Sequence, residues 1–234
     1  MNVLVISGHP ATMEILCAGT VAKYALRGDA VTLCHISNGN KGGEEIPPAE
    51  LGPVRIEESK KATAHIGADC VCLDVDDLEV DAASRKVQDE VVDIIRKARP
   101  DVIITHAPND YSPDLAAVNQ LAVQGSLKAS IYHYRTEEEP LARAVPIYCM
   151  DTFAGIGFSP DEYVDISETI ELKIKMLWEH KSVLKWLLDS KGVDFEDFVR
   201  ITGRFRGLQC GVLYAEGFVR HQAWMFTGPE KLLP

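Results

Sequence analysis

The feature that most constrains the fold of this 234-residue chain is a regular alternation of two hydrophobic patterns. Short runs of apolar and β-branched residues alternate with longer segments in which apolar residues recur three and four positions apart. The short runs, which we predict to be strands, span 2–7, 30–37, 69–75, 101–107 and 145–151. The longer segments, which we predict to be helices, span 13–28, 55–67, 84–100 and 114–129. Strands separated by crossover helices predict a mostly parallel, doubly wound α/β sheet flanked by helices.

The C-terminal part of the chain continues with two further helical patterns, over 167–190 and 195–211, and with a short apolar run over 212–220. No stretch rich in proline or serine separates this part from the rest. We therefore expect 165–234 to pack on the same sheet, so that 1–234 forms a single domain.

Composition excludes several classes of partner. The net charge is −11 and the pI is about 5.1, which argues against nucleic acid and against an anionic membrane surface. We find no apolar run of the ~18 residues that a membrane span needs and no leader-like N-terminus. Most of the six cysteines lie in apolar runs, as reduced core cysteines do. We therefore expect a protein of the reducing cytoplasm.

Polar residues stand at or just past the ends of several predicted strands. His9, Asn38, His106 and Asp151 occupy such positions. Ligands of open α/β sheets bind beyond the carboxyl ends of the strands, so these residues are candidates for a site. Each also has a purely structural interpretation. A lone histidine such as His9 is most often only hydrogen-bonded to backbone, and Thr12 after it could be a helix N-cap.

Two loops carry most of the chemistry-bearing groups. The loop SNGNKGGEE (37–45) contains three glycines and is equally well explained as a ligand-lining loop or as a surface turn. The segment ITHAPNDYSPDLAAV (104–118) brings His106, Asp110 and Asp114 within nine positions, although Asp114 could simply cap the following helix.

Taken in order, six segments resemble the LmbE-like proteins, which include the GlcNAc-phosphatidylinositol de-N-acetylases and related amino-sugar deacetylases. The segments are GHP, SNGNKGG, RIEESKKATAHIGAD, THAPNDYSPD, EHKSVL and RGLQCGVLYAEGFVR. The resemblance spans nearly the whole chain. It implies a Rossmann-like domain, and a homo-oligomer, that binds one zinc ion and removes an N-acyl group from an amino sugar.

The family signature His-Pro-Asp-Asp-Glu falls on 9–13. His9 matches a metal ligand, but Ala11 replaces the general base, Thr12 replaces a second ligand and Met13 replaces the glutamate. The signature Asp-x-His-Pro-Asp-His falls on 110–115. There Ser112 replaces the histidine thought to assist the oxyanion or the leaving group, and Leu115 replaces the third metal ligand.

A catalytic zinc needs about three protein ligands and an open position for water, and its water needs a proton acceptor. The losses therefore favour a pseudoenzyme or binding protein that keeps an amino-sugar-type pocket and needs no cofactor. The residues that we expect to matter in this family pocket, besides His9, are Asn38, Gly39, Lys41, Arg55, Tyr111 and Ser112 for binding, and His106, Asp110 and Asp114 from the catalytic region.

Two alternatives remain open. In the first, His9, His106, Asp110 and Asp114 form a rebuilt zinc site, and the chain is an active hydrolase of a carbon–nitrogen amide bond. Mixed histidine and carboxylate shells are usual for zinc and iron, and Glu14 could add a further carboxylate. In the second alternative, metal-free chemistry arises from Tyr111, Ser112 or a cysteine.

Overall fold

A computed structural model describes residues 1–224 and 230–234, and it places seven strands in one sheet. Their order is β3-β2-β1-β4-β5-β7-β6, and the first five are parallel. The strands are β1 (Asn2–Ser7), β2 (Ala30–Ser37), β3 (Asp69–Val75), β4 (Val102–Thr105), β5 (Ile147–Met150), β6 (Glu162–Asp165) and β7 (Ala215–Arg220). The mostly parallel α/β sheet expected from the sequence is therefore confirmed.

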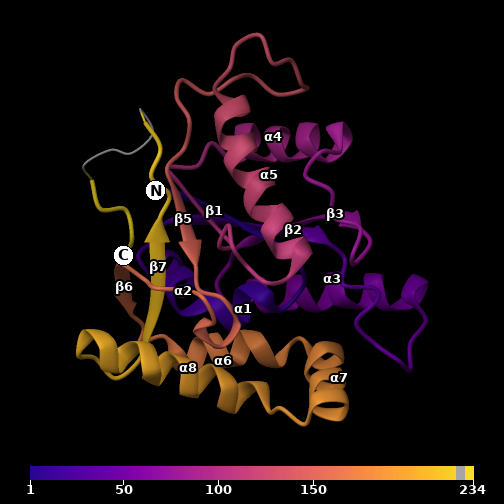
Figure 1. Ribbon diagram of the computed structural model, residues 1–234, viewed down its shortest axis with the longest axis vertical. Coiled ribbons are helices and arrows are strands. Elements are labelled where there is room, and N and C mark those ends of the chain that lie inside the picture. Colours follow the sequence, from indigo (N-terminus) through magenta and orange to yellow (C-terminus); the bar gives the residue numbers. More distant parts are fainter. Residues whose placement is uncertain (225–229) are drawn as a thin grey trace.

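Helices cover both faces of the sheet (Figure 1). Helices α4 (Arg85–Ala98) and α5 (Pro113–Ala129) pack on one face. The other face is covered by α1 (Thr12–Leu16), α2 (Ala18–Leu26), α3 (Pro48–Ala64), α6 (Ile170–Trp178), α7 (Lys181–Lys191) and α8 (Phe195–Cys210). The segment 165–234 thus contributes α6, α7 and α8 to one face and β7 to the sheet, next to the end strand β6.

The central strand β1 shows why the predicted strands are apolar throughout. Val3 and Val5 face the cluster that contains α1 and α2, whereas Leu4 and Ile6 face the cluster that contains α4 and α5. Side chains of a strand alternate between faces, so a strand covered on both sides needs apolar residues at every position.

Several elements differ from the sequence-based expectation. Helix α3 begins at Pro48 and ends at Ala64, whereas the prediction was 55–67. The helix predicted over 13–28 breaks at Cys17, because the carboxylate of Glu216 accepts hydrogen bonds from the amides of Gly19 and Thr20 and so starts a new helix. The helix predicted over 167–190 divides into α6 and α7. Strand β6 was not predicted; its four residues, EYVD, lack an apolar run and pair only with β7.

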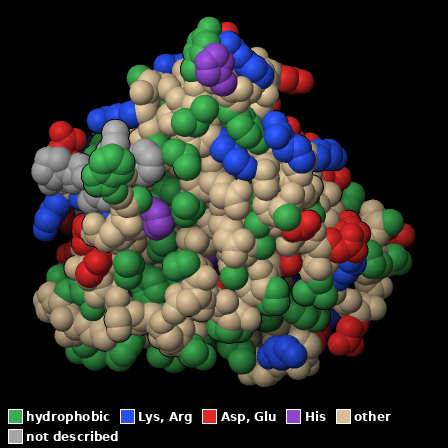
Figure 2. Space-filling model, turned by 45° about the horizontal axis from the view of Figure 1, so that its top comes forward, with side chains coloured by type: hydrophobic (Ala, Val, Ile, Leu, Met, Phe, Trp, Pro, Cys, Tyr) green, Lys and Arg blue, Asp and Glu red, His purple; other side chains and the backbone are tan. Residues whose placement is uncertain are grey.

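None of the helices in the described residues is long and apolar enough to cross a bilayer. On the face shown in Figure 2, acidic and basic side chains are scattered among neutral ones, and no continuous basic surface is seen there.

Candidate functional site

Three side chains meet where β1, β3 and β4 end. His9 follows β1, Asp77 follows β3, and Asp114 is the second residue of α5, the helix that follows β4. The Nε2 atom of His9 lies 2.9 Å from Oδ2 of Asp114 and 3.6 Å from Oδ1 of Asp77. One donor atom from each residue lies within 4.8 Å of the other two. We call these three residues the His9 cluster.

Neighbouring groups hold both carboxylates of the cluster in place. Oδ1 of Asp77 accepts a hydrogen bond from the Ser37 hydroxyl at 2.5 Å, and Oδ2 accepts one from the Lys41 amide at 3.0 Å. Asp114 accepts a hydrogen bond from the Leu78 amide at 2.8 Å. Burial opposes ionisation of Asp114, but the hydrogen bonds from His9 and from backbone amides outweigh it and lower its pKa.

His9 and Asp77 of this cluster line a cavity of about 380 Å³, whereas Asp114 lies behind them and does not line it. The cavity lies between the strand ends and helices α7 and α8, and most of its lining is apolar. It is lined by His9, Pro10, Ala11, Thr12, Ile15, Lys41, Gly42, Arg55, Asp77, Leu78, Phe153, Val183, Trp186, Leu187 and Phe195. A cavity of this size and character accommodates a small organic molecule.

The cluster has the chemistry of a cation site. One imidazole nitrogen and two carboxylate oxygens are a donor set that zinc, iron and manganese accept, and the hydrogen bonds to the carboxylates supply the outer support that such ligands usually have. The set differs from the rebuilt site considered above, since Asp77 stands where His106 and Asp110 were expected.

His106 and Asp110 do not line this cavity. The Gly8 amide donates a hydrogen bond to Nε2 of His106 at 2.9 Å, and burial lowers the pKa of this histidine to about 3, so the ring is neutral. Oδ1 of Asp110 accepts a hydrogen bond from the Ser112 amide at 2.9 Å. Burial raises the pKa of Asp110, whose Oδ2 is buried without a hydrogen-bond partner among the described residues.

Ala11, Thr12 and Leu115 stand at the positions where the family signatures have the general base and two metal ligands. Ala11 lines the cavity and has a left-handed backbone (φ 75°), which an aspartate tolerates better than an alanine does. Thr12 also lines the cavity; it is the first residue of α1 rather than its N-cap, so that structural interpretation is wrong. Leu115 is 2% exposed and its side chain packs against Gly8.

Hydrogen bonds within the loop after β2, and from neighbouring residues, fix its conformation. Asn38 hydrogen-bonds the Asn40 amide and the Asp74 carboxylate, so its amide group supports the loop and does not line the cavity. Arg55 donates hydrogen bonds to the carbonyls of Gly39 and Gly42.

Of the six binding residues expected from the sequence, Lys41 and Arg55 line the cavity, whereas Asn38, Gly39, Tyr111 and Ser112 do not. Tyr111 is 63% exposed. Ser112 is the N-cap of α5, without a side-chain cap hydrogen bond.

Sequence reasoning missed Asp77. The signal was present, because Asp76 and Asp77 directly follow the third predicted strand, at the edge where ligands bind. Glu14, considered as a further ligand, instead faces His180, with 3.2 Å between Oε1 and Nε2, and both side chains are fully buried. Burial opposes its ionisation, but His180 outweighs burial and the pKa of Glu14 is lowered.

Two deacetylases are similar to this chain over most of its length. A diacetylchitobiose deacetylase from Thermococcus kodakarensis is 27% identical over 229 residues, which cover 92% of this chain and 81% of the relative. The crystal structure of N,N'-diacetylchitobiose deacetylase from Pyrococcus horikoshii superposes with a TM-score of 0.82 at 26% identity, covering 94% of this chain and 83% of that one.

The same fold also carries a different named activity. The structure of a 4-carboxy-2-hydroxymuconate hydratase from Pseudomonas putida KT2440 matches with a TM-score of 0.82 at 21% identity, over 100% of both chains, which shows the shared fold alone. The family model described as GlcNAc-PI de-N-acetylase (PIG-L) matches residues 4–126, more than half of this sequence. The chain therefore belongs to the PIG-L family of GlcNAc-PI de-N-acetylases.

Proposed function

We propose that this chain is a binding protein of the PIG-L family that has lost the inherited deacetylation chemistry and retains a pocket for a small, sugar-like ligand. The observation that carries the proposal is the cavity beside His9, which persists although Ala11 and Thr12 replace the base and a ligand in its wall. Ser112 and Leu115 replace the two histidines of the second family signature, and neither of them lines that cavity.

The physical reason is that the lost groups act as a unit. Deacetylation requires a proton acceptor next to the attacking water and a group that stabilises the oxyanion or the leaving amine. Neither Ala11 nor Ser112 supplies those functions from its place in this structure. When coupled groups of a mechanism are removed together, the activity is lost as a whole.

A second candidate function is a metal-dependent hydrolase of a carbon–nitrogen amide bond, and the His9 cluster favours it. In that case His9, Asp77 and Asp114 would hold the metal ion, which would activate water and polarise the amide carbonyl. Burial raises the pKa of Asp110, which interacts electrostatically with His9 but does not line the cavity.

Metal analysis combined with one assay separates the two candidates. The protein is purified without chelator, its zinc, iron and manganese are quantified, and hydrolysis of N,N'-diacetylchitobiose is measured after each metal is added. The binding-protein proposal predicts substoichiometric metal and no turnover. Stoichiometric metal together with turnover that Asp77→Asn abolishes would establish the hydrolase instead.

A restoration variant tests whether the pocket still fits a sugar. Ala11→Asp, Thr12→Asp, Ser112→His and Leu115→His together rebuild the family pattern, and we expect this variant to bind zinc and to gain deacetylase activity. Bound zinc without activity would contradict a retained sugar pocket. The six free cysteines support a reducing, cytoplasmic location, and the homo-oligomer stays a prediction.

A further inference from the structure

The cavity at His9 has two walls of opposite character. On the side of the strand ends it presents polar groups, among them the imidazole of His9 and the carboxylate of Asp77. On the opposite side its residues come from the 3-10 turn η1 (Phe153–Gly155), from α7 and from the start of α8, and all of them are apolar. They are Phe153, Val183, Trp186, Leu187 and Phe195. We call these five residues the apolar wall.

Most of the apolar wall is only half-buried by the protein itself. Val183 is buried, but the other four side chains keep an intermediate exposure. Phe153 and Phe195 meet edge to face, with their ring centroids 6.4 Å apart, so each ring fixes the orientation of the other. Apolar surface that faces water inside a cavity contributes binding free energy when a ligand covers it. The wall therefore offers a preformed surface for an apolar group.

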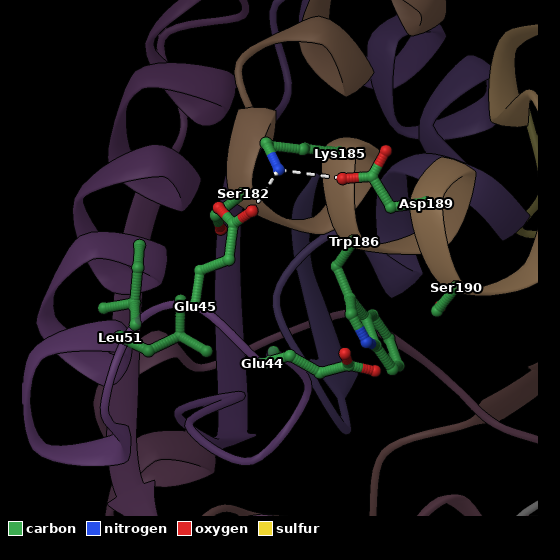
Figure 3. A pocket seen from close by; sticks show the side chains of 10 residues that line it. Glu44, Glu45, Leu51, Ser182, Lys185, Trp186, Asp189 and Ser190 are labelled. Carbon is green, nitrogen blue, oxygen red and sulfur yellow. Dashed lines mark hydrogen bonds and ion pairs between the residues drawn. The ribbon is translucent and has the colours of Figure 1, made fainter.

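The apolar surface continues into a second cavity, of about 190 Å³, because Trp186 lines both. This cavity opens between the loop after β2, the first turn of α3 and helix α7. Figure 3 shows Leu51 of α3 and Trp186 of α7 on opposite sides of it, and Ile46 also lines it. A group too long for the first cavity can therefore extend past the indole between further apolar side chains.

The cations around both cavities are already bound to other groups. Lys41 and Lys185 are each ion-paired with a glutamate, at 2.5 Å and 2.9 Å. The guanidinium of Arg55 donates hydrogen bonds to two carbonyls of the loop after β2 and lies over the Trp186 ring, 5.8 Å from its centroid. An anionic group on a ligand would find no unpaired lysine or arginine among the described residues that line either cavity. The wall therefore suits a group without charge.

Leu78 stands at the mouth of the cavity in a conformation that needs support. It lines the cavity although it is 77% exposed, and its backbone is left-handed, with φ at 65°. This conformation is unfavourable for leucine, and a hydrogen bond of 2.8 Å from its amide to Asp114 holds it in place. Backbone strain of this kind gathers at functional sites. Here it keeps a large apolar side chain where an entering ligand would cover it.

We propose that the two cavities bind an uncharged amphiphile, whose polar, hydroxyl-bearing end lies at His9 and Asp77 and whose alkyl or aryl group lies along the apolar wall. Hydroxyl groups can donate hydrogen bonds to a carboxylate and exchange them with an imidazole. The apolar group displaces water from the half-buried side chains of the wall. This inference rests on the proposed function, because it takes the cavity at His9 as the site of the sugar-like ligand and adds the class of group attached to it.

Calorimetric titration with n-alkyl β-D-glucosides tests the role of the apolar wall. The probes are the methyl, butyl and hexyl glucosides, at concentrations at which no micelles form, and the ω-carboxy analogue of the hexyl compound. We expect the affinity to increase with chain length, by about fourfold for each methylene that becomes buried. The carboxy analogue should bind more weakly than hexyl glucoside, because its charge would leave water without a cationic partner.

Two variants and a matched control locate the effect within the molecule. Trp186→Ala removes the side chain that the two cavities share, so the increase from butyl to hexyl glucoside should be lost. Leu78→Asn replaces the leucine by a residue that tolerates the left-handed backbone, so the alkyl glucosides should bind more weakly without loss of stability. Leu188→Ala is the control, because Leu188 is a 53% exposed residue of α7 that lines neither cavity. Thermal unfolding checks that each variant is folded.

The results separate this inference from the proposed function. Affinities that are independent of chain length, a chain-length dependence that Trp186→Ala leaves intact, or a carboxy analogue that binds as tightly as hexyl glucoside would overturn the inference and leave the ligand pocket standing. If no glucoside of the series binds the wild-type protein, the proposed sugar-like ligand is wrong and the inference falls with it.

Discussion

A buried histidine should make the stability of this protein fall steeply in mild acid. His106 is fully buried, and its Nε2 atom accepts the hydrogen bond from the Gly8 amide, a role that only the neutral ring can play. Burial lowers the pKa of His106 from 6.5 to about 3. The unfolded chain therefore binds a proton at this residue below about pH 6.5, whereas the folded chain does not until about pH 3.

The sign and size of the effect follow from this difference. Between pH 6.5 and pH 3 the unfolded state binds more protons, so the free energy of unfolding decreases as the pH falls, by about 1.4 kcal/mol per pH unit. At pH 5 the loss from His106 is about 2 kcal/mol. His35 is buried in the same way, with its pKa lowered to about 4, and adds a loss of similar size. Together they remove a large part of the 5–15 kcal/mol that stabilises a typical domain.

Urea unfolding at pH 7.5 and pH 5.0, on protein kept free of metal with chelator, measures this loss. In His106→Gln the carboxamide oxygen can accept the Gly8 amide without titrating, so the difference between the two pH values should shrink by about 2 kcal/mol. His133→Gln, at an exposed position, controls for the loss of an imidazole. An unchanged pH difference in His106→Gln would refute this assignment.

Three further predictions concern the scaffold. Glu216→Gln leaves the buried ammonium of Lys173 without its counter-charge, and urea unfolding should show a loss of about 3–5 kcal/mol; a loss below 1 kcal/mol would contradict it. Gly8→Ala places a Cβ 2.3 Å from Cδ2 of Leu115, so it should cost about 1–3 kcal/mol; in a double-mutant cycle with Leu115→Ala, additive losses would argue against this clash. Arg55→Lys cannot span two loop carbonyls, and we expect about 1–3 kcal/mol of destabilisation together with faster proteolysis at the loop after β2; unchanged cleavage would contradict that role.

The elements of the fold that could be predicted are those whose patterns come from burial on both faces. Strands β1, β2, β4 and β5 read as apolar runs because helices cover them on both sides, whereas the edge strand β3 is only partly buried. Strand β6 lies at the end of the sheet, alternates poorly and gains its place only by pairing with β7. The break at Cys17 was equally inaccessible, because it is set by Glu216, almost 200 positions away in the sequence.

Part of the candidate site could be predicted from the sequence, because polar residues at the ends of the predicted strands can be recognised there. The rule that ligands bind at strand ends pointed to His9, and the structure brings His9 together with Asp114 of the segment 104–118. The rule could not rank the other polar residues at those ends. Whether such a residue faces the cavity depends on its local hydrogen bonds. His106 is turned away by the Gly8 amide and Asn38 by Asp74, whereas Asp77 is held at the cavity wall by Ser37.

The pattern of loss and retention in this chain has a structural explanation. Replacing Asp114 would remove the hydrogen bond to the Leu78 amide, and replacing Glu14 would leave the fully buried His180 without its carboxylate partner. Position 12 faces the cavity and position 115 is filled by an apolar side chain, and neither threonine nor leucine leaves a buried charge there. Under the proposed binding function no metal is needed, so these two positions could change without loss of the fold, whereas the bracing residues could not. The proposed pocket without its catalytic groups is therefore compatible with the energetics of this scaffold.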